Sequence, residues 1–192
     1  MLYDNNKRCM KEDIDYSKPV YSKSILEFIT VANEYCLFFE NAEKYSVDDI
    51  LLYFQKIGPL LYLKGSVLPH VDVNDELFNE RIVTEEQWEN IFKILREKFA
   101  DNDVYFTLDH NNDSEESSLS DNMADIYQDM KDFVLLYQKP YEYSKENAVS
   151  EIRRLFRQHW GIRVLNALTT IHRLIYKNDI DAMIFPDSEL PE

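Results

Sequence analysis

Glycine and proline are scarce in this sequence, with three glycines and six prolines among 192 residues. A many-stranded β-sandwich or barrel needs a tight turn at each hairpin, and those turns depend on such residues. The shortage therefore favours helices. Hydrophobic residues make up 45% of the chain and aromatic residues 14%, enough for a core whose burial offsets the entropy of ordering.

Cysteines are also few, and long apolar runs are missing. Cys9 and Cys36 show neither CxxC nor zinc-ligand spacing, and a small secreted domain would usually carry more cysteines. We therefore expect two free thiols in a reducing compartment. The first residues contain no apolar signal-peptide region, and no run of 18 apolar residues follows, which predicts a cytoplasmic protein without a membrane partner.

Basic residues are outnumbered by acidic ones, 21 against 36, and the formal net charge is −15. A protein that contacts phosphates needs a basic face, so this balance argues against a general nucleic-acid binder. The charge by itself says more about solubility than about function.

Apolar residues recur every three to four positions over five segments, which predicts an all-α, single-domain bundle of five to six amphipathic helices. We expect a flexible N-terminal arm over 1–21, a helical domain over 22–177 and an acidic C-terminal tail over 178–192. The expected helices cover about 24–44, 47–64, 85–99, 121–139 and 145–177. Their expected N-caps are Ser24 with Glu27, Ser46, Thr84 with Gln87, and Ser120.

Two of these helices contain residues that can bend or interrupt a helix. Gly58-Pro59 should kink the second helix without ending it, because the apolar period continues to Leu61. The last segment fits either one long helix or two helices joined at Trp160-Gly161. Between the helices, 66–83 is predicted to be a long connection, Val104–Leu108 a short extended piece, and Asp109–Ser120 a mobile polar run.

The last helical segment reverses the charge of the chain, with seven bases against two acids in residues 144–177. Arg153, Arg157, His159 and Arg163 are close enough along a helix to hold a phosphate or carboxylate ligand. The alternative is that these bases form ion pairs with residues 101–132, which contain ten acids and one base. We favour the ion pairs, because they shift local charge as readily as a site does.

Two acidic patterns suggest metals, and both are weak. Asp125, Asp129 and Asp132 share one side of a helix, but the Glu-x-x-His motif of carboxylate metal bundles is absent, so aspartates that are solvated or paired with arginine are favoured. The spacing of Asp109, Asn111 and Asp113 matches the start of a calcium-binding loop, but the later positions do not match that pattern. Its sixth, eighth and twelfth positions are Ser114, Glu116 and Ser120. We therefore predict neither a metal nor a cofactor.

No catalytic constellation emerges from the motifs. The four histidines lack HExxH spacing, and P-loop, GxGxxG and GxSxG motifs are absent. Cys36 lies on the apolar stripe of its helix, which favours a packed thiol over a nucleophile, although a Cys–His pair formed in the fold stays open. The sequence therefore identifies no catalytic residue, and we favour a protein that is not an enzyme.

Most of the chain, from about Ser24 to Lys177, resembles a bacterial domain family of unknown function. The segments that carry the resemblance are FITVANEYCLFFENA, GPLLYLKG, VTEEQWENIF and FRQHWGIRVLNAL. The resemblance implies a small intracellular helical domain, and it implies no reaction.

Two functions remain as hypotheses. The first is a non-enzymatic interaction module whose aromatic and acidic surface binds another protein, for example as an inhibitor or immunity-like protein of a basic enzyme. The second is a small-molecule-binding protein or enzyme in which Arg153, Arg157, His159 and Arg163 surround an anionic group. The oligomeric state is left open.

Overall fold

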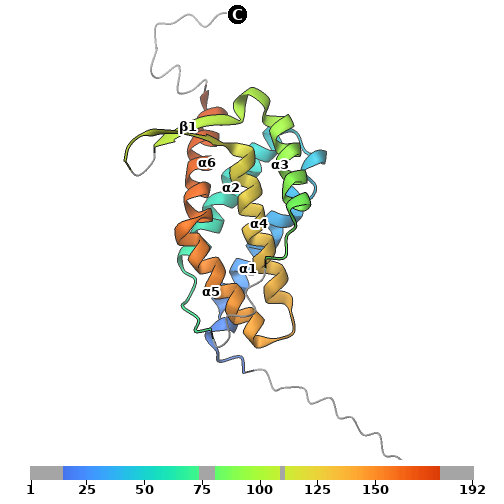
Figure 1. Cartoon of the computed structure of the whole chain (residues 1–192), viewed down its shortest axis with the longest axis vertical. Coiled ribbons are helices and arrows are strands. Elements are labelled where there is room, and N and C mark those ends of the chain that lie inside the picture. The colour runs from blue at the N-terminus through green and yellow to red at the C-terminus, as the bar shows by residue number, and fades with distance from the viewer. Residues whose placement is uncertain (1–14, 74–80, 109–110, 178–192) are drawn as a thin grey trace, which may run out of the picture.

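Helices dominate the computed structural model, which describes residues 15–73, 81–108 and 111–177. The described residues form six α-helices and one β-hairpin, so the predicted all-α bundle is confirmed. The helices are α1 (Lys23–Phe39), α2 (Val47–Ser66), α3 (Glu85–Phe99), α4 (Leu119–Gln138), α5 (Glu142–Gln158) and α6 (Trp160–Ile175), and the strands are β1 (Val104–Leu108) and β2 (Ser114–Ser118) (Figure 1).

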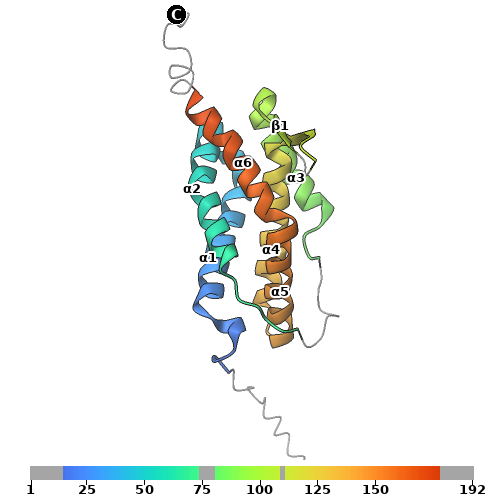
Figure 2. The same cartoon turned by 90° about the vertical axis from the view of Figure 1, so that its left-hand side faces the viewer.

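Helix α4 is the central element of the bundle. It packs against α1, α3, α5 and α6, whereas α2 packs mainly on α1 and α6. Figure 2 shows α1 and α2 on one side of α4 and α5, with α3 on the other side. The hairpin leaves the bundle near the N-terminal end of α4 and projects sideways past α6 (Figure 1).

The apolar stripes meet in a continuous core, as their period predicts. Ile25, Phe28 and Phe39 of α1 are fully buried, and Trp160 at the start of α6 is the largest side chain in the core. Cys36 is a free, buried thiol, as predicted, and burial raises its pKa. It is therefore a packing residue with little thiolate character.

Two predicted N-caps are confirmed and two are wrong. Capping boxes open α2 at Ser46 and α3 at Thr84. Helix α1 begins after Ser22, two residues earlier than a Ser24 cap would place it, and its Glu27 instead pairs with Lys64 at 2.6 Å. The prediction that α1 reaches residue 44 is also wrong, because Ala42–Lys44 forms a separate 3-10 turn.

Helix α4 also begins earlier than predicted, and for a clear reason. Ser118 is its N-cap and accepts a hydrogen bond from the Asp121 backbone N–H at 3.1 Å. The predicted cap, Ser120, is buried, and both its N–H and its hydroxyl donate to Asp103 at 2.8 and 2.9 Å. A tertiary contact with Asp103 therefore holds the Ser120 side chain, which local spacing had predicted to be the cap.

Prolines and glycines shape two other helices. Helix α2 continues through Pro59 to Ser66, as the apolar period predicts. The long C-terminal segment is two helices, which meet at His159 with φ −139° and ψ −84°. A Cβ on Gly161 would lie 2.2 Å from the Phe156 carbonyl oxygen, so this close junction requires glycine.

The hairpin confirms one prediction and overturns another. Val104–Leu108 is extended, as expected, and pairs antiparallel with Ser114–Ser118 so that Tyr105 lies opposite Ser117. The prediction of a mobile polar run is wrong for Ser114–Ser118, which forms β2 although it has no apolar residue to bury. Asp109 of the calcium-like run lies outside the described residues.

Within the described ranges, no helix combines the length and hydrophobicity needed to cross a membrane.

At the N-terminal end, Pro19–Tyr21 forms a 3-10 turn in which Val20 is buried. The hydroxyl of Tyr137 donates to the Val20 carbonyl at 2.9 Å, which attaches this turn to α4.

Candidate functional site

One face of α4 carries four aspartates that pair with basic residues from other parts of the chain. Acids and bases alternate, so that each base lies between two acids. We call this set the aspartate ladder. From the N-terminal end of α4 its members are Asp121, Arg163, Asp125, His159, Asp129, Arg81 and Asp132.

Arg163 forms the outer part of the ladder. Its guanidinium lies 3.3 Å from Asp121 and 2.7 Å from Asp125, and it also donates to the Asn122 side chain at 2.9 Å. Trp88 of α3 donates its indole N–H to Asp125 at 2.9 Å. Burial alone would raise the pKa of Asp125, but hydrogen bonding and nearby positive charge outweigh it, and the pKa is lowered.

His159 occupies the middle of the ladder, at the junction of α5 and α6. Its Nδ1 lies 2.6 Å from Asp129, and its Nε2 lies 3.5 Å from Asp125 and 3.2 Å from Arg163 Nε. Hydrogen bonding to Asp125 and Asp129 raises the pKa of His159 to about 9. The two aspartates therefore favour the protonated imidazole at neutral pH. The Arg163 Nε–H that points at Nε2 favours the neutral ring, and nearby positive charge from Arg163 lowers the pKa of His159, but the contacts with the two aspartates outweigh it.

Asp132 and Arg81 form the inner end of the ladder. One oxygen of Asp132 accepts the backbone N–H groups of Ile82 and Val83 at 2.8 and 2.7 Å. The Arg81 guanidinium is 3.2 Å from Asp129 and 3.4 Å from the second Asp132 oxygen. Burial raises the pKa of Asp132. These contacts attach the chain before α3 to the middle of α4.

The ladder contains more acidic than basic side chains. Four carboxylates face three bases, so the set carries one net negative charge when all members are ionised. An anion that approached His159 or Arg163 would therefore meet cations that already have carboxylate partners. Among the described residues, no three His, Cys, Asp or Glu side chains are arranged to hold a metal ion.

The four residues predicted to form a ligand site are divided by the structure. His159 and Arg163 lie together in the ladder. Arg153 donates to the Leu68 carbonyl at 3.3 Å, on the connection that follows α2. Arg157 is exposed on α5. The two α5 arginines therefore do not converge with the other two.

Some ladder members were missed by sequence reasoning. Asp121 could have been found, because it precedes Asp125 by the same four residues that separate Asp125 from Asp129. Arg81 lies in a connection without periodicity, so no local signal identifies it. Trp88, which binds the ladder from α3 through its indole N–H on Asp125, likewise has no local signal for this role.

A groove of about 310 Å³ opens beside the outer end of the ladder, between the hairpin and α6. We call it the hairpin groove. Its lining combines acidic and polar side chains with the exposed Ile162 and with His159 and Arg163. The remaining lining residues are Thr107, Glu115, Glu116, Ser117, Asp121, Asn122, Gln158 and Asn166.

On its other face, the hairpin exposes three apolar side chains of β1 next to the polar Ser114, Glu116 and Ser118 of β2. Val104, Phe106 and Leu108 alternate along β1 with exposed fractions of 40%, 68% and 65%. The hairpin base is held by Asp103, which is buried and accepts hydrogen bonds from Ser118 and Ser120. An anchored base thus presents three apolar side chains away from the bundle.

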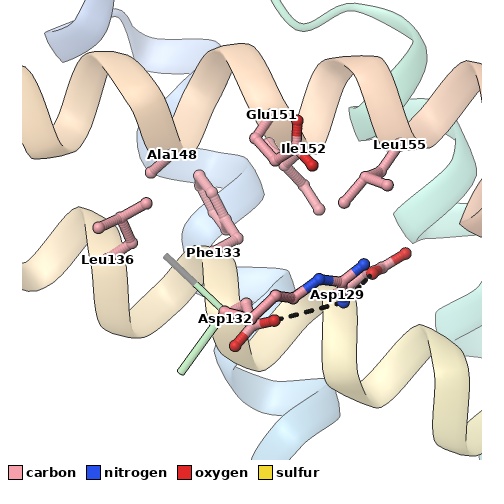
Figure 3. Close-up of a pocket in the computed structure, with 9 residues that line it drawn as sticks. Asp129, Asp132, Phe133, Leu136, Ala148, Glu151, Ile152 and Leu155 are labelled. Carbon is pink, nitrogen blue, oxygen red and sulfur yellow. Dashed lines mark hydrogen bonds and ion pairs between the residues drawn. The ribbon is translucent and has the colours of Figure 1, made fainter. Parts of the chain in front are cut away.

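A smaller cavity of about 100 Å³ lies at the inner end of the ladder, between α4 and α5. We call it the interhelical cavity. Figure 3 shows Phe133 and Leu136 of α4 facing Ile152 and Leu155 of α5, with carboxylates of both helices at its edge. Its complete lining is Arg81, Asp129, Asp132, Phe133, Leu136, Ala148, Glu151, Ile152 and Leu155.

The chain matches a known protein family and resembles a solved structure. Residues 19–177 match the family described as Domain of unknown function (DUF5063). The crystal structure of protein BF1032 from Bacteroides fragilis is similar, with 31% sequence identity and a TM-score of 0.74, over 82% of this chain and 95% of that one. No curated protein matches the chain.

Proposed function

Since this chain belongs to the DUF5063 family, a family of unknown function, its role must be inferred from its surfaces, and we propose a non-enzymatic protein–protein interaction module. The hairpin is the binding element. The observation that carries the proposal is the outward apolar face of β1, where Phe106 and Leu108 are both about two-thirds exposed. Exposed apolar patches of this kind mark interaction sites on monomers.

The charge around the hairpin indicates the chemistry of the partner. Between Lys98 and Lys131 the chain contains nine acids and neither lysine nor arginine. Several of these acids belong to the ladder or are buried, whereas Asp113, Glu115 and Glu116 are exposed at the hairpin. On the hairpin itself, Glu116 pairs with Phe106 across the strands, which places a carboxylate beside the aromatic ring. A partner with an apolar pocket surrounded by basic residues would complement this surface and be attracted by it over a distance.

An inhibitor or immunity-like protein that binds a basic enzyme fits this description, and a bacterial cytoplasm is the proposed setting. The hairpin supplies an apolar anchor that is fixed at its base, which lowers the entropy lost on binding. The competing hypothesis, an anion site formed by Arg153, Arg157, His159 and Arg163, receives less support. Two of its members lie elsewhere, and the other two are paired with aspartates.

The test compares affinity capture from bacterial lysate by the natural chain and by the double variant Phe106→Ser, Leu108→Ser. A specific partner should be retained by the natural chain and lost by the variant, since the anchor residues supply most of the binding energy in such interfaces. Capture should also weaken between about 0.1 M and about 1 M salt, where the Debye length falls from roughly 10 Å to 3 Å.

Leu63→Ser on α2 is the matched control, because Leu63 is 58% exposed and lies outside the hairpin. It should retain the same partner. If the double variant captures the same proteins as the natural chain, or if Leu63→Ser loses them equally, the hairpin is not the binding element.

A further inference from the structure

We propose that the interhelical cavity binds an aliphatic cation, an alkylammonium or alkylguanidinium group whose stem enters between α4 and α5. The hairpin contributes no residue to this cavity, so the inference does not depend on the proposed function. It rests on the shape of the cavity, on the two carboxylates at its end and on the way in which Arg81 occupies that end.

The walls of the cavity suit a short aliphatic stem. Phe133, Leu136, Ala148, Ile152 and Leu155 line it, and each of them is buried. A volume of about 100 Å³ exceeds the space that a single water needs and approaches that of cavities that bind small apolar molecules. Bound water would have few polar partners along these walls, whereas methylene groups would replace it favourably.

The end of the cavity selects positive charge. Asp129 is 0% exposed and Asp132 is 12% exposed, and each directs one oxygen toward Arg81. The third acidic residue of the lining, Glu151, comes from α5 and pairs with Arg154 at 2.6 Å. The other oxygen of Asp129 is bound by His159, and the other oxygen of Asp132 accepts two backbone N–H groups. The two oxygens that face Arg81 are therefore the ones that a ligand cation would take over, and an uncharged ligand would supply no cation to them.

Arg81 shows that a guanidinium fits this end, and it is held loosely. Its distances to Asp129 and Asp132 are 3.2 and 3.4 Å, longer than the roughly 2.7–2.9 Å of a good charge-assisted hydrogen bond. Its side chain is 53% exposed. A ligand cation could therefore replace Arg81 at shorter distance, and Arg81 would move into water at little cost.

The experiment titrates the full chain with n-butylamine and n-butylguanidine, and follows the methyl resonances of Leu136, Ile152 and Leu155 by NMR. n-Butanol and butyrate are the neutral and anionic probes of the same length. The two cations should shift these methyl resonances at lower concentration than either other probe. Equal binding of butanol would reduce the site to an apolar void and overturn the proposal.

Two variants test the charged end. Arg81→Ala removes the internal competitor, and affinity for butylamine should rise about tenfold if Arg81 occupies the site about nine-tenths of the time. Asp132→Asn should weaken binding by about tenfold, while its amide oxygen still accepts the Ile82 and Val83 N–H groups. Arg157→Ala, which removes an exposed arginine of α5 from outside the cavity lining, is the control and should leave affinity unchanged.

A capped tripeptide with a central lysine separates the two sources of such a cation. Binding of the peptide with the same dependence on Arg81 and Asp132 identifies a side chain of a partner protein, and binding of the free amines alone identifies a small molecule. If neither the natural chain nor Arg81→Ala binds any cation more tightly than butanol, the cavity is a packing feature and the inference fails.

Discussion

The two faces of α4 are stabilised in different ways. Toward α1, buried apolar side chains meet in direct contact, as in the packing of Phe133 on Phe28 with ring centroids 5.2 Å apart. Toward α3 and α6, the same helix presents the aspartate ladder. The first face depends on the shapes of its side chains, and the second depends on each charge having a partner.

This difference affects what each face tolerates. An apolar face accepts changes that preserve volume and rejects those that create clashes or holes. A buried charged face accepts no change that removes one partner alone, because the remaining charge is then buried without compensation. The four predictions below test this contrast, in order of expected effect.

The largest effect is expected for Asp129→Ala, at the centre of the ladder. Asp129 is fully buried and lies between His159 and Arg81, so its loss leaves two bases without their shared carboxylate. The free energy of unfolding should fall by about 3–5 kcal/mol, measured by urea denaturation. Asp72→Ala, which removes a carboxylate that is 96% exposed, should have almost no effect. A loss of less than about 1 kcal/mol at Asp129 would show that the ladder does not stabilise the fold.

The next largest effect is expected on the shape-dependent side of the bundle, for Gly65→Ala. A Cβ at Gly65 would lie 2.3 Å from Cη2 of Trp160, a fully buried ring that cannot move aside. We expect a loss of about 3 kcal/mol in thermal or urea unfolding.

Gly58→Ala on the same helix is the matched control. Its Cβ would meet the side-chain ends of Phe54 at 3.1 Å and Leu168 at 3.3 Å, which can shift by tenths of an ångström. The better helix propensity of alanine should keep this change within about 1 kcal/mol of the natural chain. Equal losses at both glycines would show that backbone propensity, and not the contact with Trp160, determines the result.

A pH-dependent loss of stability is expected from His159. Its pKa is about 9 in the folded chain against 6.5 for a free histidine, so protonation stabilises the fold fully below pH 6.5 and is lost as pH rises through 9. The side chain is 29% exposed, and with solvent screening the loss should be roughly 2 kcal/mol. His159→Gln should lack this slope between pH 6.5 and 9. A natural chain with flat stability over that interval would contradict the assigned pairing.

The smallest effect is expected for Asp121→Asn, at the outer end of the ladder. Asp121 is 43% exposed, and burial together with the neighbouring Asp125 raises its pKa. Its ion pair with Arg163 should contribute less than about 1 kcal/mol to the free energy of unfolding. Comparison of Asp121→Asn with Asp129→Asn by urea denaturation checks whether the ladder becomes more sensitive toward its buried centre. Equal losses of unfolding free energy in the two variants would show that sensitivity does not increase toward the buried centre.

Sequence reasoning succeeded where the determining contacts are local. The capping boxes at Ser46 and Thr84 and the passage of α2 through Pro59 follow from residues within one or two helical turns. It failed at Ser120, because a buried Asp103 seventeen residues away binds this residue and Ser118 caps the helix instead. It also failed at Ser114–Ser118, because a polar strand owes its structure to the partner strand and not to its own propensity.

The candidate site was predictable in part. The charge reversal after residue 144 and the aspartate spacing on α4 both indicated ion pairing, and His159, Arg163, Asp125 and Asp129 do pair. Arg81 enters from a connection whose path cannot be read from periodicity, so the cavity that it borders was not anticipated. The outward direction of Phe106 was equally hidden, since alternation along a strand does not say which face meets the bundle.

The sequence by itself determined the class of fold, because apolar residues at intervals of three to four can be buried together only when the chain is helical. It also determined the acidity of the chain and of the segment between Lys98 and Lys131. Only the tertiary structure decided which charges are partners, where the cavity and groove open, and which face of the hairpin meets solvent. Those features join residues that lie far apart along the chain, and their energies depend on distance and burial, which exist only after the helices have packed.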